Sequence, residues 1–248
     1  MRVSYMDVAY FAKSLKGENV VSYEDGKNFP SASLIKIFIA LCLGNEIEKG
    51  RLSLMDTMEF DISDENSVAG AGALKFLEQG HDFSINELMR LMLAFSDNCA
   101  TNMLIDYIGL EKIQDFLTDK YPNTRLNRKM MQIPKSADKD NLSTAKEVAE
   151  ALEEIFSRAQ AGEAYYVEIL DALRKQECFN SLGLYIEGVE IAHKTGTLVN
   201  LEHDAGIVFE EDNSYIVVVL VKGLSNQRCR EEIGKISLDI FREMEKVK

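Results

Sequence analysis

The chain of 248 residues contains no tryptophan, three prolines, three histidines and four cysteines. The cysteines show no metal-site spacing, and three of them fall in stretches that read as helix, so we expect free and mostly buried thiols. They are Cys42, Cys99, Cys178 and Cys229. Because the few histidines and cysteines form no His-x-x-His or Cys-x-x-Cys pair, the sequence predicts neither a metal site nor another cofactor.

Long apolar runs and basic charge are also scarce. No stretch approaches 18 consecutive apolar residues, so no membrane span is expected. The net charge of −13 argues against nucleic acid or an anionic membrane as partner. We expect a small-molecule substrate instead, and we expect the protein to be a monomer. The N-terminus lacks the basic and apolar runs of a secretory signal, so the compartment stays open: either cytoplasmic, or secreted with a leader removed.

Strand-like runs lie at both ends of the chain and helical periods lie between them. The predicted strands are Val8–Leu15, Val20–Tyr23, Val189–Thr197, Ala205–Phe209 and Tyr215–Val221. The predicted helices are Ser33–Glu48, one from the Ser84 cap through Leu93, Cys99–Ile108, Leu110–Leu117, Ser143–Ser157, Glu163–Lys175 and a closing helix through Ile233 and Met244. The stretch 123–141 has no sustained period and reads as a long loop, a kind of segment that is often functional. This pattern indicates an α+β fold with one antiparallel sheet built from both ends.

A serine and a lysine, Ser33 and Lys36, stand three positions apart at the start of the first predicted helix. Residues at this spacing share one helix face, so the lysine amine can reach the serine hydroxyl. A neighbouring base is what turns such a hydroxyl into a nucleophile. The same spacing recurs at Ser136 and Ser143, but these read as a loop residue and a helix cap.

Two more triplets follow, Ser-Asp-Asn from Ser96 and Lys-Thr-Gly from Lys194, at distances of 63 and then 98 residues. Alone, the first would be an ordinary turn between helices. The second lies on a predicted strand, where its glycine permits close approach of another backbone or a ligand. The ordered trio supplies two hydroxyls and two amines that can converge on one acyl group.

The trio resembles the signature of class A β-lactamases and penicillin-binding proteins. The resemblance implies a β-lactamase-like fold: a five-stranded antiparallel sheet from both termini with flanking helices, plus an inserted all-α lobe. The α/β lobe would comprise residues 1–48 and 176–248. The all-α lobe would comprise residues 49–175, with an omega-like loop at 123–141.

The resemblance also implies the roles of the motif residues. Ser33 would be the nucleophile and Lys36 its base, while Ser96 would relay a proton to the leaving amine and Asp97 would be structural. Lys194 would place positive charge near Ser96 and near a substrate carboxylate. The implied substrate-binding residues are Asn98, Thr195, Gly196, Thr197 and His203. Among them, Asn98 would bind the substrate amide and steady Lys36, and the N–H of Thr197 would form an oxyanion hole with that of Ser33. His203 stands where many class A enzymes have a carboxylate-binding arginine, although a polar turn residue is an equal alternative.

The long loop departs from the family pattern. Arg128 matches the family's loop anchor, with Asp140 as its expected partner, but Met130 stands where active class A enzymes carry the deacylating glutamate. The nearest acids are Asp138 and Asp140. Because a general base contributes roughly 10²–10⁴-fold, we expect a serine hydrolase that is acylated by β-lactams or related amides and esters and deacylates slowly. A D,D-peptidase or esterase, or a penicillin-binding sensor without turnover, are the alternatives.

Overall fold

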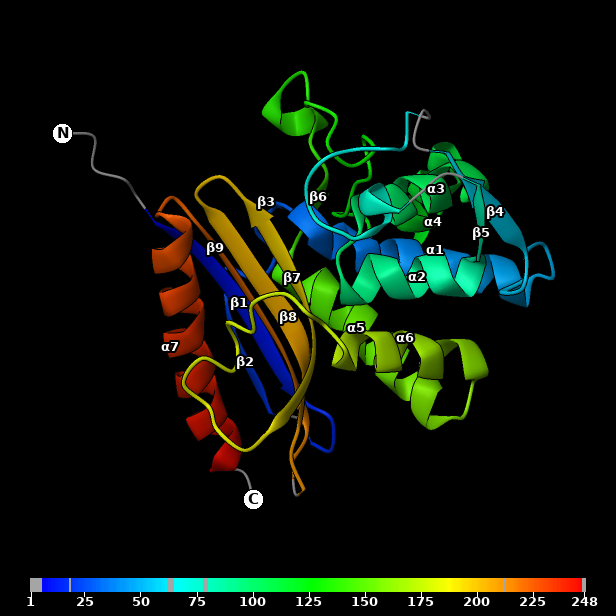
Figure 1. The fold of residues 1–248 in the computed structure, drawn as a ribbon. Coiled ribbons are helices and arrows are strands. Elements are labelled where there is room, and N and C mark those ends of the chain that lie inside the picture. Colours follow the sequence, from blue (N-terminus) through cyan, green and yellow to red (C-terminus); the bar gives the residue numbers. More distant parts are fainter. Residues whose placement is uncertain (1–5, 18, 62–64, 78–79, 212, 247–248) are drawn as a thin grey trace.

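The computed structural model describes residues 6–17, 19–61, 65–77, 80–211 and 213–246. Five strands form one antiparallel sheet in the order β2-β1-β9-β8-β7 (Figure 1). They are β1 (Asp7–Ser14), β2 (Val20–Tyr23), β7 (Glu190–Leu198), β8 (Leu201–Phe209) and β9 (Tyr215–Lys222). The first strand pairs with the last, so both ends of the chain build the sheet, as predicted. Strand β8 begins at Leu201 rather than at the expected Ala205 because it pairs with β7 along its whole length.

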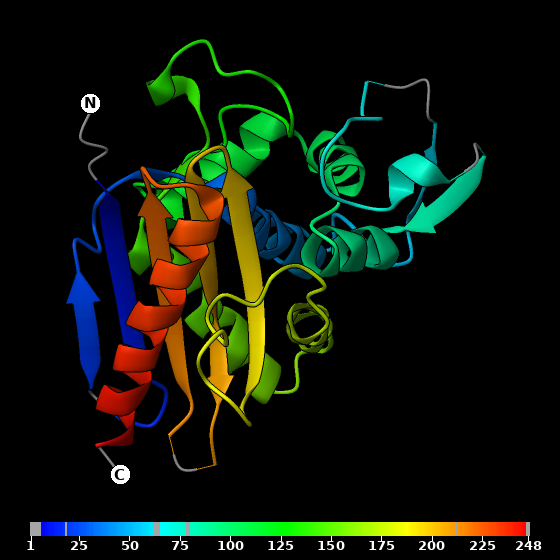
Figure 2. The same ribbon diagram turned by 60° about the vertical axis from the view of Figure 1, so that its left-hand side comes forward.

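Helices cover both faces of the sheet. They are α1 (Ile35–Glu48), α2 (Ile85–Ala94), α3 (Asn98–Ile108), α4 (Leu110–Lys120), α5 (Ala145–Gln160), α6 (Ala164–Arg174) and α7 (Asn226–Glu245). Helix α7 packs on β8 and β9 from one side, and α5 packs on β1, β8 and β9 from the other (Figure 2). The α+β, β-lactamase-like fold class is therefore confirmed.

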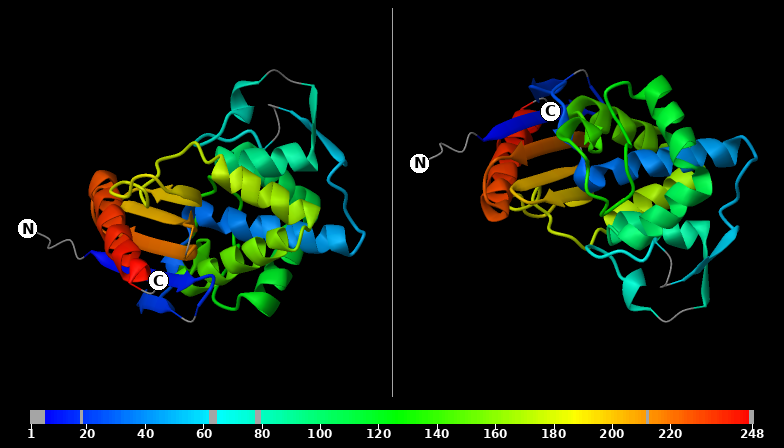
Figure 3. Two further views of the ribbon diagram at one scale, coloured as in Figure 1. Left: turned by 90° about the horizontal axis from the view of Figure 1, so that it is seen from below. Right: turned by 90° about the horizontal axis from the view of Figure 1, so that it is seen from above.

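Helix α1 runs through the middle of the other helices (Figure 3). Its residues from Ile35 through Gly44 are all buried, so it is buried on every side. Such a helix belongs inside a protein core rather than at its surface. It holds the segment around Ser33 and Lys36 at the junction between the sheet and the helices.

Short elements that the sequence did not reveal adjust two helix boundaries. The turn η1 (Ala32–Leu34) is a 3₁₀ turn, so Ser33 lies just before α1 rather than within it. Ser143 pairs with Phe29 in a two-stranded ribbon, and the side chain of Thr144 caps α5 instead. The remaining short elements are β3 (Phe29–Pro30), β4 (Thr57–Phe60), β5 (His81–Ser84), β6 (Leu142–Ser143), η2 (Leu74–Phe76) and η3 (Ala137–Lys139).

All four cysteines are free, as predicted. Cys42, Cys99 and Cys229 are buried on helices, whereas Cys178 is partly exposed. In the described part of the chain, no helix is both long and apolar enough to cross a membrane.

Candidate active site

Ser33 stands on a tightly packed turn. The residue before it, Ala32, has a left-handed backbone with φ of +46°, a conformation that costs a non-glycine residue about 1 kcal/mol or more. Strand β7 passes directly against this turn at Gly196. A Cβ atom at Gly196 would lie 3.2 Å from both the Ala32 Cβ and the Ser31 carbonyl oxygen. Glycine thus allows the edge strand β7 to lie beside the Ser33 segment.

The second triplet forms the turn between α2 and α3. Ser96 is buried and has φ of +52°. The Asp97 carboxylate caps α3 by accepting the N–H of Ala100 at 3.0 Å. It also accepts the N–H groups of Ala73 and Leu74, at 2.7 and 2.8 Å. Asp97 therefore pins the chain before η2 to the turn that carries Ser96, a structural role.

Lys36 is fully buried beneath this turn. Its Nζ donates to the Ser96 carbonyl oxygen at 2.6 Å, to Ser96 Oγ at 3.2 Å and to Asn98 Oδ1 at 2.8 Å. Within the described residues no hydrogen bond joins Lys36 to Ser33, so the second triplet, not the serine, takes all three donors of the ammonium. Burial first, and the charge of Lys194 second, hold the pKa of Lys36 well below its usual range, against an opposing effect of Asp97.

Lys194 is likewise fully buried, on β7, and its Nζ donates to the Thr195 carbonyl oxygen at 3.1 Å. Burial lowers its pKa to about 8, opposed by Cys178 and Asp204. Because one buried cation depresses the pKa of the other, the site favours one neutral lysine beside one charged lysine.

One cavity of about 530 Å³ joins residues of all three motifs, a size suited to a small molecule. Its lining contains Ser33, Ser96, Asn98, Thr195 and Thr197 from the predicted site. It also contains residues that the sequence analysis missed: Gly70, Ala71, Met131, Glu177, Cys178, Phe179 and Glu202. Glu202 lies opposite Thr197 in the β7–β8 hairpin, but the predicted strand began only at Ala205, so the sequence did not place Glu202 beside the motif. Among the described residues, no group of three or more His, Cys, Asp or Glu side chains could hold a metal ion.

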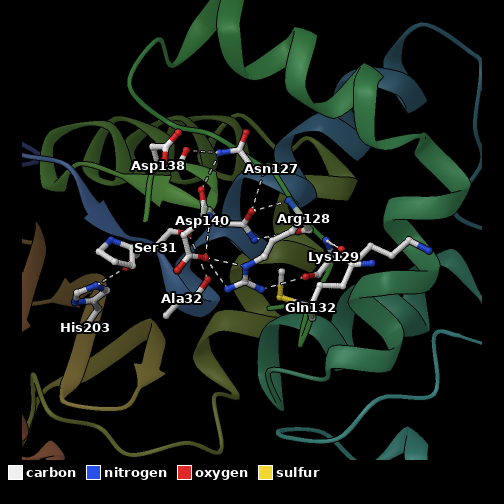
Figure 4. Close-up of polar contacts among 12 residues, drawn as sticks. Ser31, Ala32, Asn127, Arg128, Lys129, Gln132, Asp138, Asp140 and His203 are labelled. Carbon is white, nitrogen blue, oxygen red and sulfur yellow. Dashed lines mark hydrogen bonds and ion pairs between the residues drawn. The ribbon is translucent and has the colours of Figure 1, made fainter. Parts of the chain in front are cut away.

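His203 does not reach this cavity, so its expected role at a substrate carboxylate is wrong. His203 is 1% exposed, with Nε2 2.9 Å from the Pro30 carbonyl oxygen (Figure 4). Its Nδ1 lies 2.8 Å from the Glu202 carbonyl oxygen and 3.3 Å from the Val221 nitrogen. Burial lowers the pKa of the ring to about 4. His203 lies opposite Gly196 in the sheet, and its side chain passes beneath the Ser33 turn. It supports that turn as a neutral group.

The loop 123–141 closes on itself by an ion pair. The Arg128 guanidinium bonds the Asp140 carboxylate, with Nη2 and Oδ1 2.6 Å apart (Figure 4). The Asn141 side chain accepts the N–H groups of Asn127 and Arg128, at 2.8 and 3.1 Å. The anchor expected from the sequence is therefore present.

Met130 lies inside this loop, where its side chain is 6% exposed. Its backbone is clamped by Asn102, whose Oδ1 accepts the Met130 N–H at 2.7 Å and whose Nδ2 donates to the Met130 carbonyl oxygen at 3.3 Å. It lines a second cavity of about 280 Å³ that also touches Ser33. Asp140 lines this cavity but is paired with Arg128, and Asp138 is exposed at the surface.

The chain matches the Beta-lactamase enzyme family over residues 4–244. It is 24% identical over 228 residues to the extended-spectrum β-lactamase PER-1 of Pseudomonas aeruginosa, covering 84% of this chain and 72% of that protein. The crystal structure of a β-lactamase from Sphaerobacter thermophilus superposes with a TM-score of 0.88 at 24% identity, covering 98% and 93% of the two chains. The structure of PBP-A, also solved as a mutant acyl-enzyme complex with penicillin G, superposes with a TM-score of 0.86 at 24% identity, covering 99% and 92%.

The fold and the three motifs define the superfamily of class A β-lactamases and penicillin-binding serine hydrolases. Within it, this chain belongs to the Beta-lactamase enzyme family. That membership supports a serine β-lactamase-like hydrolase.

Proposed function

We propose that Ser33 attacks the carbonyl carbon of β-lactams or of related amides and esters and becomes acylated. The observation that carries the proposal is the position of Lys36, fully buried and hydrogen-bonded to Ser96 and Asn98 next to the cavity that Ser33 lines. A buried amine with a depressed pKa is a suitable base near neutral pH. Catalytic hydrogen bonds are often long before substrate binds, so the proposal is compatible with a Lys36 that bonds Ser96 and Asn98 in the free protein.

The proton then follows the hydrogen bonds of the site. Neutral Lys36 takes the Ser33 proton as the new C–O bond forms. Ser96 gives its hydroxyl proton to the leaving nitrogen as the C–N bond breaks, and Lys36 returns the proton it took to Ser96 Oγ across their hydrogen bond. The N–H groups of Ser33 and Thr197 would receive the negative charge that develops on the carbonyl oxygen. Lys194 and Thr195 provide charge and a hydroxyl for the far end of the substrate.

The same proposal includes slow release of the acyl group. The cavity beside Ser33 on the loop side is lined by Met130 and Met131, neither of which can deprotonate water. Its one acid, Asp140, is held by Arg128. A penicillin-binding protein without turnover is therefore the second candidate function, favoured because the one acid that lines this cavity, Asp140, is paired with Arg128.

Intact-protein mass spectrometry over time after mixing with benzylpenicillin tests both steps. We expect rapid gain of one penicilloyl group at Ser33, slow loss of it, and no labelling of Ser33→Ala. Equal labelling of Ser33→Ala would exclude Ser33 as the nucleophile. Steady turnover of a chromogenic cephalosporin would identify a true β-lactamase, and turnover of simple esters alone would identify an esterase.

A further inference from the structure

Glu202 is a buried carboxylate in the wall of the proposed acylation cavity, and neither the motifs nor the proposed mechanism uses it. We infer that Glu202 is a specificity-determining residue: its charge opposes the attraction of Lys194 and slows acylation by substrates that carry a carboxylate near Thr195, relative to neutral ones. This inference rests on the proposed acylation of Ser33.

Glu202 accepts three hydrogen bonds at the wall of the cavity. Thr197 Oγ1 donates to its Oε2 at 2.7 Å. Asn226 Nδ2 and an Arg230 Nη1 both donate to its Oε1 at 2.9 Å. The single hydroxyl proton of Thr197 is thereby committed to Glu202 and cannot also be donated to a substrate. In effect, the protein supplies its own carboxylate to these three groups.

Arg230, the cation that pairs with Glu202, is not among the residues that line the cavity. The Arg230 guanidinium lies over the ring of Phe179, 4.4 Å from the ring centroid. Its side chain is 28% exposed, whereas that of Glu202 is 4% exposed. Water therefore screens the arginine more than the glutamate, and the negative end of the pair faces the substrate.

The β7–β8 register places this charge next to Thr195. Thr197 lies opposite Glu202 and Thr195 opposite Asp204, so Glu202 is the diagonal neighbour of Thr195 on one face of the hairpin. Diagonal neighbours are about 7–8 Å apart. Taking this spacing of roughly 8 Å as the scale of the separation between a substrate carboxylate at Thr195 and that of Glu202, their repulsion at an effective dielectric constant near 20 corresponds to roughly 30-fold in rate. With screening by solvent, we expect about ten-fold.

The test compares benzylpenicillin with its methyl ester, which lacks the negative charge, by measuring second-order acylation rates with mass spectrometry. Glu202→Gln keeps the size and removes the charge. It should raise the acylation rate for benzylpenicillin about ten-fold and leave that for the ester within about two-fold. Glu231→Gln, an equal charge change on α7 outside the cavity, is the matched control and should move neither rate. Should Glu202→Gln not fold, Glu202→Thr, which suits a strand, gives the same comparison.

An unchanged or smaller ratio of benzylpenicillin to ester rates in the uncharged variant would overturn the role of Glu202 while leaving acylation of Ser33 intact. An equal shift produced by Glu231→Gln would also overturn it, because the effect would then arise from net charge alone. No acylation of the wild type by either compound would overturn the proposed function and the inference together.

Discussion

Met130→Glu places a carboxylate in the cavity beside Ser33, where the only acid now in the lining, Asp140, is paired with Arg128. We expect deacylation to become on the order of ten-fold faster, about 1.4 kcal/mol in activation free energy. This is less than the roughly 10²–10⁴-fold of a well-positioned base. Asn102 fixes only the backbone at position 130, and the nearby Arg128 is already paired with Asp140, so nothing orients the new side chain. Acylation should change little, because Lys36 and Ser96 are untouched.

The substitution also costs stability. Met130 is 6% exposed and packs in the main hydrophobic core, and a buried group that lacks hydrogen-bond partners costs about 1–3 kcal/mol. The assay is decay of the penicilloyl adduct by mass spectrometry, together with unfolding by denaturant. Met130→Gln is the control, since it has the same shape and polarity but cannot accept a proton. Equal acceleration by Gln and Glu, or rapid deacylation already in the wild type, would refute the reasoning and direct attention to Asp138 or Asp140.

Two further predictions follow from the buried titratable groups. The acylation rate should rise with pH as Lys36 loses its proton and level off well below the usual lysine pKa of about 10.4, because burial and Lys194 depress its pKa; a plateau reached only near pH 10 would exclude Lys36 as the neutral base. His203 has a pKa of about 4 in the folded protein, against about 6.5 when unfolded, so the unfolded chain binds more protons between these values. The contribution of His203 to the free energy of unfolding should therefore be fully present above about pH 6.5 and should fall by up to about 3 kcal/mol toward pH 4. Measured by denaturant unfolding, His203→Gln should lose less stability over this pH range than the wild type. Parallel curves of unfolding free energy against pH for the two proteins would contradict the burial of a neutral ring.

Much of the fold was determined by local sequence patterns. Apolar strand-like runs at both ends and helical periods between them predicted the α+β class and the sheet. The division into lobes at residues 48 and 176 remains a prediction, and α5, which falls in the predicted all-α lobe, packs on the sheet. The three motifs, and the methionine at position 130 in place of a glutamate, could also be identified from the sequence, because they depend on residue type and order alone.

Only the tertiary structure decided which way the side chains face and what they meet. Lys36 bonds Ser96 and Asn98, and among the described residues no hydrogen bond joins it to Ser33, because the partners come from a turn 60 residues further along the chain. His203 turns beneath the Ser33 segment, whereas its neighbour Glu202 faces the cavity, because successive residues of a strand point to opposite faces. Sequence gives that alternation, but which face becomes a cavity wall depends on the elements that pack against it from distant parts of the chain.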